Sequence, residues 1–301
     1  MTLLFAFHLP KLDTMIECEY RDMPEPLILP GCVPLHGKDF AESTQNRKDD
    51  SYRVVLHHMK QYMRAEGIFV NSFLDLEPGA IHAFQTEDPD WPPFGSGGTL
   101  SCEQFNELAT GLEGSGHKFL WVVKNPDKKC SLGSTISARK QENQYEFLPK
   151  GFVERIKDLG LLVPSWAPQI EILSHKAIGG FLTHCGWNSI LESIVHGVPL
   201  IAWPLYAEQK MNVVMLTEGL KVALRPNTNK HGLVEAEEIV KVVKDLMEGE
   251  EGKIAYNRMK KISDLAKKAT SENGDSMKLL GETTLTWRVL DRQSSSNSNK
   301  V

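Results

Sequence analysis

Six consecutive residues with the sequence HCGWNS, His184 to Ser189, combine an imidazole, an indole, an amide and a hydroxyl around one glycine. They follow a short apolar run and precede a segment with apolar residues at helical spacing, which predicts a turn between a strand and a helix. A helix N-terminus offers backbone N–H groups to an anion, and Gly186 would let the backbone approach that anion closely. The turn therefore predicts a phosphate or diphosphate site.

Each polar group of this turn also has a simpler interpretation. A histidine at the end of a buried strand commonly bonds to backbone in the core, so His184 fits that role as well as donation to a diphosphate. Asn188 and Ser189 stand at the expected N-cap, where side-chain oxygens satisfy backbone N–H groups. The indoles of Trp187 and Trp203 fit core packing better than ligand binding.

Further polar groups fall at the same place in the expected structure. Glu192 lies four residues after Asn188 on one helix face, where it is either a solvated glutamate or an acceptor for ribose hydroxyls. Trp166 ends a strand and could stack a nucleobase. Glu208 and Gln209 follow the next strand and could bind sugar hydroxyls. Together these groups predict a site for a nucleoside diphosphate that carries a polyol.

The elements that must position these groups form a strand–helix–strand unit. Apolar runs at Ile178–Thr183 and Val198–Trp203 bracket a helical pattern over residues 188–195. Strands and helices alternate from about residue 94 onward, including a buried strand at 117–124. This alternation predicts an α/β fold with a doubly wound parallel sheet, and such sheets bind ligands at the carboxyl ends of their strands.

The N-terminal part gives weaker signals. Residues 1–50 contain five prolines and few periodic segments, so we expect mostly irregular structure there. Asp50 and Ser51 predict the start of a helix that runs to Arg64. A short strand is expected at 68–71, and a second helix at 75–84.

A glycine-rich segment, Phe94–Gly98 with the sequence FGSGG, precedes a helical pattern at 100–112. It resembles a phosphate-binding loop, but such a loop carries weight only after a strand. The preceding residues 87–93 are acidic and proline-rich, which does not fit a central strand. On its own, this segment is a weak indication of a phosphate site.

The composition excludes several classes of protein. The chain has 301 residues, of which 41% are hydrophobic and 24% charged, and its net charge of −5 gives no basic field for nucleic acid. Its five cysteines lack C-x-x-C spacing, which argues against a zinc site or disulfide framework and fits a reducing cytosol. The apolar run Leu3–Phe7 is too short to span a membrane and lacks the basic flank of a secretory signal, so we expect a core segment there and no membrane insertion.

The stretch Trp166–Gln209 begins with WAPQ, contains HCGWNS and ends with EQ over 44 residues. It resembles the signature box of plant secondary-product glycosyltransferases, which are UDP-sugar-dependent enzymes with the GT-B fold. Further segments, HLPKLD, LPGCVPLHGKD, FGSGGTLS, FLPKGF and PLYAEQKMN, resemble the branch that glucosylates hydroquinone and monolignols. The resemblance implies a GT-B-like α/β fold, UDP-glucose as donor, a small phenolic acceptor, and inverting O-glucosyl transfer.

The resemblance also implies roles for the residues that would hold the uridine. Trp166 would stack on uracil, and the backbone of Ala167 would bond the edge of that base. Gln169 would lie near the ribose, whose hydroxyls Glu192 would hold.

The remaining roles concern the diphosphate and the sugar. The resemblance assigns the diphosphate to five residues: Ser96, His184, Trp187 through its backbone, Asn188 and Ser189. Glu208 and Gln209 would bind sugar hydroxyls, and the final glutamine implies glucose rather than galactose. No metal or other cofactor is implied, because the helix N-terminus and His184 would stabilise the charge of the leaving group.

The same resemblance divides the chain. Residues 1–93 would be a remnant of an acceptor-binding N-terminal domain, 94–275 a UDP-sugar-binding Rossmann-like domain, 276–290 a C-terminal helix, and 291–301 a disordered tail. The family has a linker and a strand before FGSGG that are missing here, which implies an internal deletion near Pro93-Phe94.

The catalytic base is the remaining question. The base histidine of the family and its aspartate would precede Met1, so no residue of this chain is assigned as catalytic. One hypothesis is a cytoplasmic, monomeric glucosyltransferase of small phenols. The alternative is an inactive, truncated form that at most binds UDP-sugar or associates with full-length relatives. For residues 1–301 alone we expect negligible transfer, because a positioned base contributes about 10²–10⁴-fold to the rate.

Overall fold

The C-terminal part of the chain alternates strands and helices, as predicted. The computed structural model describes residues 2–62, 70–86, 100–123, 145 and 147–298. The expected strand–helix–strand unit is confirmed, with shorter strands: β3 (Phe181–Thr183), α8 (Trp187–His196) and β4 (Leu200–Ala202). The other elements of this part are α5 (Cys102–Ser115), β1 (Phe119–Val123), α6 (Phe152–Arg155), β2 (Gly160–Pro164), α7 (Gln169–Ser174), α9 (Gln209–Val214), the π-helical turn η4 (Met215–Gly219), β5 (Ala223–Leu224), α10 (Ala236–Glu248), α11 (Glu250–Ala269) and α12 (Asp275–Ser298).

All the strands run parallel, in two hydrogen-bonded groups. β1 pairs with β2, while β3, β4 and β5 pair in that order. A common doubly wound sheet has the strand order 3-2-1-4-5-6. If β1 to β5 correspond to the second to sixth strands of that fold in sequence order, the order across the sheet becomes β2-β1, an open place where the first strand would lie, then β3-β4-β5. Within the described ranges no strand pairs with the edges of β1 and β3 that face this open place.

The two groups of strands rest on one helical layer. Ile239, Val242 and Leu246 of α10 lie on one face of that helix and pack with Leu108 of α5 and Ile201 of β4. The spacing of the three α10 residues is that of an amphipathic helix. Trp121 of β1 and Leu182 of β3 pack against the same cluster, so side chains connect the two sheets that lack shared hydrogen bonds.

A second layer covers the opposite face. Ile190 and Ile194 of α8 are fully buried and belong to a large apolar cluster that includes Met259 of α11. α8 ends at Gly197, which has φ of 72° and bonds back to the helix. Glycine accepts this left-handed conformation without steric cost, so the helix stops directly before β4.

The N-terminal part is more helical than predicted. Residues 2–15 form α1, residues 42–45 form the short helix α2, and residues 50–62 form α3, which confirms the helix expected from Asp50. Single 3₁₀ turns lie at Tyr20–Asp22 and Gly37–Asp39, and α4 spans Pro78–Thr86. The strand expected at 68–71 lies partly outside the described residues, and Val70 and Asn71 are not in a strand.

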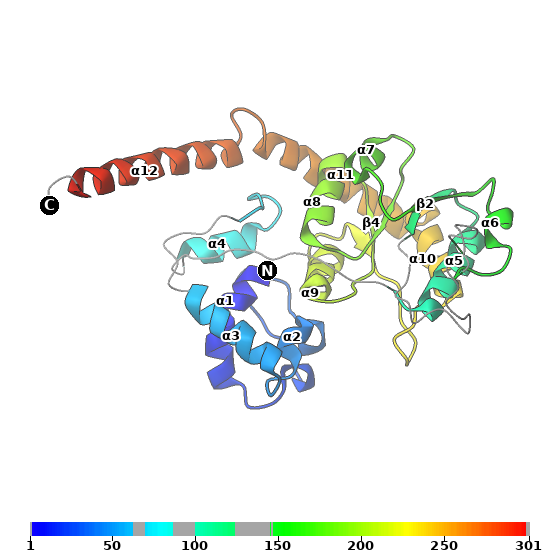
Figure 1. Cartoon of the computed structure of the whole chain (residues 1–301), viewed down its shortest axis with the longest axis horizontal. Coiled ribbons are helices and arrows are strands. Elements are labelled where there is room, and N and C mark those ends of the chain that lie inside the picture. Colours follow the sequence, from blue (N-terminus) through cyan, green and yellow to red (C-terminus); the bar gives the residue numbers. More distant parts are fainter. Residues whose placement is uncertain (1, 63–69, 87–99, 124–144, 146, 299–301) are drawn as a thin grey trace, which may run out of the picture.

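These first 86 residues share a core with the C-terminal part. Leu4, Leu9 and Phe40 are fully buried in the cluster that also contains Ile190 and Met211. In Figure 1, α1 to α4 accordingly lie together beside α8 and α9, away from α5, α6 and α10. The N-terminal helices therefore pack directly against the sheet and its helices.

The cysteines and the last helix add to what the sequence indicates. Cys102 is disulfide-bonded, whereas Cys18, Cys32 and Cys185 have free thiols; one disulfide is not the disulfide framework against which the cysteine spacing argues. The helix predicted at 276–290 continues to Ser298 as α12, because no glycine or proline after Gly281 stops it. Despite its 24 residues, α12 is not long and apolar enough to cross a membrane, and the same holds for the other helices within the described ranges.

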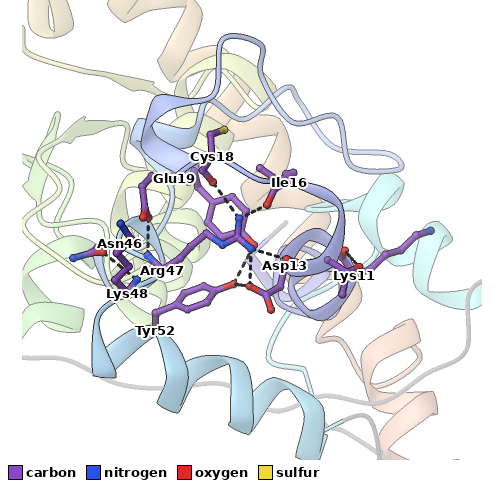
Figure 2. A network of polar contacts seen from close by, with 11 residues as sticks. Lys11, Asp13, Ile16, Cys18, Glu19, Asn46, Arg47, Lys48 and Tyr52 are labelled. Carbon is purple, nitrogen blue, oxygen red and sulfur yellow. Dashed lines mark hydrogen bonds and ion pairs between the residues drawn. The ribbon is translucent and has the colours of Figure 1, made fainter.

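A polar network holds the N-terminal helices together (Figure 2). The guanidinium of Arg47 donates to the carbonyls of Ile16 and Cys18, and to the carbonyl and carboxylate of Asp13, which lies near the end of α1. Tyr52 of α3 donates to the same carboxylate over 2.5 Å. Arg47 therefore connects α1, the following loop and α3 through one charged group.

We expect Arg47→Met to lower the free energy of unfolding by about 2–3 kcal/mol, because several hydrogen bonds to a charged group are lost and Asp13 loses its cationic partner. Urea denaturation measures this change. The matched control is Arg53→Met, which breaks an exposed ion pair with Asp50 on α3 and should cost less than about 0.5 kcal/mol. Equal effects of the two substitutions would contradict the structural role of Arg47.

Candidate donor-binding site

Three turns at the carboxyl ends of strands contain a residue in the left-handed conformation. Ser165 follows β2 with φ of 63°, Cys185 follows β3 with φ of 64°, and Ala207 follows β4 with φ of 53°. Residues with side chains avoid this region at a cost of about 1–3 kcal/mol each, and such strain concentrates at functional sites. Lys221, the other such residue in the described part of the chain, precedes β5 instead.

Each strained residue stands directly before a residue that the sequence singles out: Trp166 and Glu208 as ligand-binding residues, and Gly186 as the place where the backbone can approach an anion closely. Ser165 precedes Trp166, Cys185 precedes Gly186, and Ala207 precedes Glu208. Ligands of doubly wound sheets bind at this edge. The turn geometry therefore supports the edge chosen from the polar residue types alone.

The turn after β3 brings an imidazole against a glycine. A Cβ on Gly186 would lie 2.5 Å from Nε2 of His184, so the ring occupies the space that any other residue at 186 would fill. α8 begins at Trp187 with Gly186 as its N-cap, two residues earlier than expected. Asn188 and Ser189 therefore lie inside the first turn, where backbone N–H groups have no acceptor within the helix.

His184 is half-buried, and burial lowers the pKa of its imidazole because the charged form loses hydration. The neutral ring can donate one hydrogen bond and accept another. The neighbouring thiol of Cys185 is fully buried, which raises its pKa to about 12. Cys185 is therefore a structural residue of the turn and has no thiolate character at neutral pH.

The lowered pKa of His184 predicts a pH dependence. Unfolded histidine titrates near pH 6.5, so the folded chain resists protonation of His184 below that pH, and this contribution to stability is lost as pH falls through the lowered pKa. We expect the melting temperature to fall less between pH 7.5 and pH 5 in His184→Gln than in the wild type. If scanning calorimetry gives the same decrease in melting temperature for His184→Gln and the wild type, the lowered pKa of His184 is contradicted.

Three predicted residues meet between α7 and α8. The side-chain amide of Gln169 donates to the carboxylate of Glu192 over 2.6 Å and to the hydroxyl of Ser189 over 3.3 Å. The carboxylate of Glu192 thus accepts a hydrogen bond from this amide, and a ribose hydroxyl could take the place of the amide. A cavity of about 330 Å³ opens beside Asn188 and Glu192. A second cavity of about 400 Å³, at the start of α5, contains none of the predicted residues.

The turn after β2 displays an indole to solvent. Trp166 is 74% exposed, although it lies only two residues after the end of β2, while Ala167 beside it is buried. Large aromatic side chains are usually well buried. An indole face left open at a ligand-binding edge suits the stacking of a planar base.

The turn after β4 uses its glutamine differently from the expectation. Gln209 is 2% exposed, and its side-chain oxygen accepts the N–H groups of Leu205 at 2.8 Å and Tyr206 at 3.0 Å. Only the amide NH₂ of Gln209 is left to donate to a sugar. Glu208 is partly buried, and burial raises the pKa of its carboxyl.

The two other tryptophans of this stretch behave as packing residues. Trp203 is buried in the cluster of α5 and α10. The ring N–H of Trp187 donates to the carbonyl of Asn71 over 2.6 Å, which links α8 to the N-terminal part.

Ser96 of the glycine loop and the suspected deletion at Pro93-Phe94 lie outside the described residues. Within the described ranges no three His, Cys, Asp or Glu side chains form a metal-binding group.

One residue of the site region was missed from the sequence. Asn212 is buried in α9 and bonds the carbonyl of Cys185 over 3.0 Å. A single polar residue inside the apolar run 211–215 (MNVVM) was the available signal, because a buried amide needs partners. Its partner, 27 residues away along the chain, could not be identified from that pattern.

The described strands and helices define an α/β protein of the doubly wound class, with strained turns and polar side chains at the ligand-binding edge. Within this class, residues 95–267 match the model of the family described as UDP-glucoronosyl and UDP-glucosyl transferase. The chain belongs to this family of transferases, and its fold is GT-B-like.

Individual relatives agree with this assignment. Hydroquinone glucosyltransferase of Rauvolfia serpentina is 53% identical over 95% of this chain and 69% of its own length. The solved structure of apo UGT2 from Phytolacca americana has a TM-score of 0.87 and 61% identity, over 95% of this chain and 69% of that one. The same UGT2 complexed with UDP-2fluoro-glucose and pterostilbene gives a TM-score of 0.85 and 59% identity, over 94% and 67%.

The match to the Rauvolfia relative contains gaps on this chain's side. It extends over 324 aligned positions, which exceeds the 301 residues of the chain, so at least 23 positions of that relative have no counterpart here. This difference agrees with the internal deletion that the sequence implies.

Proposed function

We propose that the edge formed by the turns after β2, β3 and β4 binds UDP-glucose, and that the protein is an O-glucosyltransferase of small phenolic acceptors. The observation that carries this proposal is the placement of Ser165, Cys185 and Ala207 in left-handed conformations, each next to a residue predicted to bind the donor: Trp166, His184 and Glu208. Three independently strained turns on one edge indicate one extended ligand that contacts all of them.

Each part of the donor is matched to one turn. The exposed indole of Trp166 stacks on uracil, with the backbone of Ala167 at the base edge, and Gln169 and Glu192 hold the ribose hydroxyls. The diphosphate is held by His184, the N–H groups at the start of α8, Asn188, Ser189 and, from the glycine loop, Ser96. Glu208 and the amide NH₂ of Gln209 bind the glucose hydroxyls.

The proposed reaction is an inverting displacement. An acceptor hydroxyl attacks the anomeric carbon, the bond from that carbon to the diphosphate oxygen breaks, and UDP leaves. The helix N-terminus and a hydrogen bond from His184 stabilise the charge that develops on the diphosphate. No metal is needed for this stabilisation, and no residue of the chain is assigned as the base that accepts the acceptor proton.

The relatives support the donor and the acceptor class. One relative is a hydroquinone glucosyltransferase, and another was solved with UDP-2fluoro-glucose and pterostilbene. We further propose that residues 94–275 form the donor domain, followed by the C-terminal helix α12, with 1–93 belonging to the acceptor side, in a monomeric cytoplasmic protein.

The second candidate function is binding without transfer, alone or together with full-length relatives. It is favoured by the positions of the Rauvolfia relative that have no counterpart in this chain. Both candidates share the donor site and differ in turnover alone.

Calorimetric titration with UDP tests the shared site. We expect Glu192→Ala to weaken UDP binding about 10- to 100-fold, since a hydrogen bond to a charged group contributes about 1.5–3 kcal/mol. The control is Glu171→Ala, which removes an exposed carboxylate from the neighbouring α7. Unchanged affinity in Glu192→Ala would remove this residue from the site, and a wild type that does not bind UDP would overturn both candidate functions.

Incubation of the purified chain with UDP-glucose and hydroquinone separates the two candidates. Formation of the glucoside supports the transferase. UDP binding without glucoside supports the non-catalytic form.

A further inference from the structure

A buried amide connects two of the three strained turns. Asn212 is 3% exposed and lies in α9, one turn after Glu208 and Gln209. Its Nδ2 donates to the carbonyl oxygen of Cys185 over 3.0 Å, and its Oδ1 accepts from the hydroxyl of Thr2 over 3.1 Å. The orientation of the amide is determined by chemistry, because the carbonyl can only accept and the hydroxyl can donate.

The carbonyl that Asn212 holds belongs to a residue under strain. Cys185 has φ of 64° and is fully buried. Its N–H donates to the hydroxyl of Thr183 over 3.3 Å, and Asn212 holds the other end of the residue. A left-handed residue with a side chain persists only where the surroundings determine it, and a buried carbonyl without a donor would cost about 1–3 kcal/mol.

The orientation of this peptide group decides where the next residues point. Gly186 follows Cys185 directly and is the N-cap of α8, so the N–H groups of Trp187 and Asn188 come within three residues of the held carbonyl. If the peptide group turned, the start of α8 and its N–H groups would turn with it. The amide of Asn212 therefore acts at the place where the diphosphate is expected to bind.

We propose that Asn212 is a positioning residue of the donor site, which fixes the strained Cys185 turn so that the start of α8 is aimed at a nucleoside diphosphate. This inference rests on the proposed function. Asn212 makes no contact with the ligand itself, and it couples the turn that holds the diphosphate to the helix that begins at the sugar-binding residues.

The two sides of the amide give a matched test. Asn212→Asp keeps the shape and the bond from Thr2 but cannot donate to the Cys185 carbonyl, whereas Thr2→Val removes the bond on the other side and leaves the carbonyl held. Each of these two variants loses one of the two hydrogen bonds that the side chain at position 212 makes. Asn212→Ala serves as a second variant that buries no charge.

The readout is the ratio of affinities for UDP and uridine, measured by calorimetry and ligand-observed NMR, with the melting temperature recorded in parallel. We expect both Asn212 variants to bind UDP at least about tenfold more weakly while uridine binding changes less than about twofold. Thr2→Val should leave both affinities within about twofold. Because uridine lacks the diphosphate, a change confined to UDP locates the effect at the start of α8.

Other outcomes overturn the inference in distinguishable ways. If the Asn212 variants lose affinity for UDP and for uridine by the same factor, Asn212 is a packing residue only. The same conclusion holds if their affinities and melting temperatures equal those of Thr2→Val. If the wild type binds uridine and UDP equally, the diphosphate does not bind at α8 and the proposed function fails first.

Discussion

Gly186→Ala is expected to weaken UDP binding about 10- to 100-fold while leaving the fold intact. The added Cβ would lie 2.5 Å from Nε2 of His184, so the imidazole must leave the position beside the start of α8. Loss of a hydrogen bond to a charged phosphate corresponds to about 1.5–3 kcal/mol, which gives this range. Calorimetric titration with UDP measures the effect.

The backbone of Gly186 makes this substitution a clean test. Its φ of −64° and ψ of 143° suit alanine, so the effect arises from the contact with His184 and not from backbone strain. Gly281→Ala on α12 is the control, because a Cβ there meets nothing within 4 Å. Normal UDP affinity in Gly186→Ala with an unchanged melting temperature would show that the His184 ring does not contribute to the site.

Trp166→Ala is also expected to have a large effect on UDP binding. Stacking of a base on an aromatic side chain contributes about 1–3 kcal/mol, which corresponds to roughly 5- to 150-fold in affinity. Because the indole is 74% exposed, its removal should change the free energy of unfolding by less than about 0.5 kcal/mol. Affinity and stability are therefore expected to separate in this variant.

The control for Trp166→Ala is Trp166→Phe, which keeps an aromatic face and should retain most of the affinity. A second control, Tyr256→Ala, removes an exposed aromatic from α11, far along the chain from the site. If Trp166→Ala binds UDP as the wild type does, the base does not stack there and the uridine end of the proposal is wrong.

The strand–helix–strand unit was predictable because its local signals agree. Two short apolar runs bracket a helix whose apolar residues recur at helical spacing, and the structure confirms β3, α8 and β4. The start of α8 was placed two residues late, because the N-cap is Gly186 and not a polar residue. Side-chain preferences for N-caps do not identify a glycine cap.

Other features depend on contacts between distant parts of the chain and could not be predicted locally. α1 is apolar on most sides and contains Pro10, so its sequence shows no clear helical period, yet Leu4 and Leu9 are buried against the rest of the core. Similarly, the oxygen of Gln209 is held inside its own turn, and the partner of Asn212 lies across the sheet edge. Residue types indicated polar groups there, and only tertiary packing decides which of them remain available to a ligand.

The open place between β1 and β3 has a consequence for cooperativity. Within the described residues the two sheets share no ladder hydrogen bonds and are joined by side chains such as Trp121 and Leu182 on a common helical layer. On that basis β1–β2 and β3–β5 can open as separate units with different amide-exchange rates. The proposed uridine position after β2 belongs to one unit, and the start of α8 after β3 belongs to the other. A nucleotide bound to both units would crosslink them. Opening of either unit would then also require loss of the nucleotide contacts, so part of the binding free energy would couple the two units.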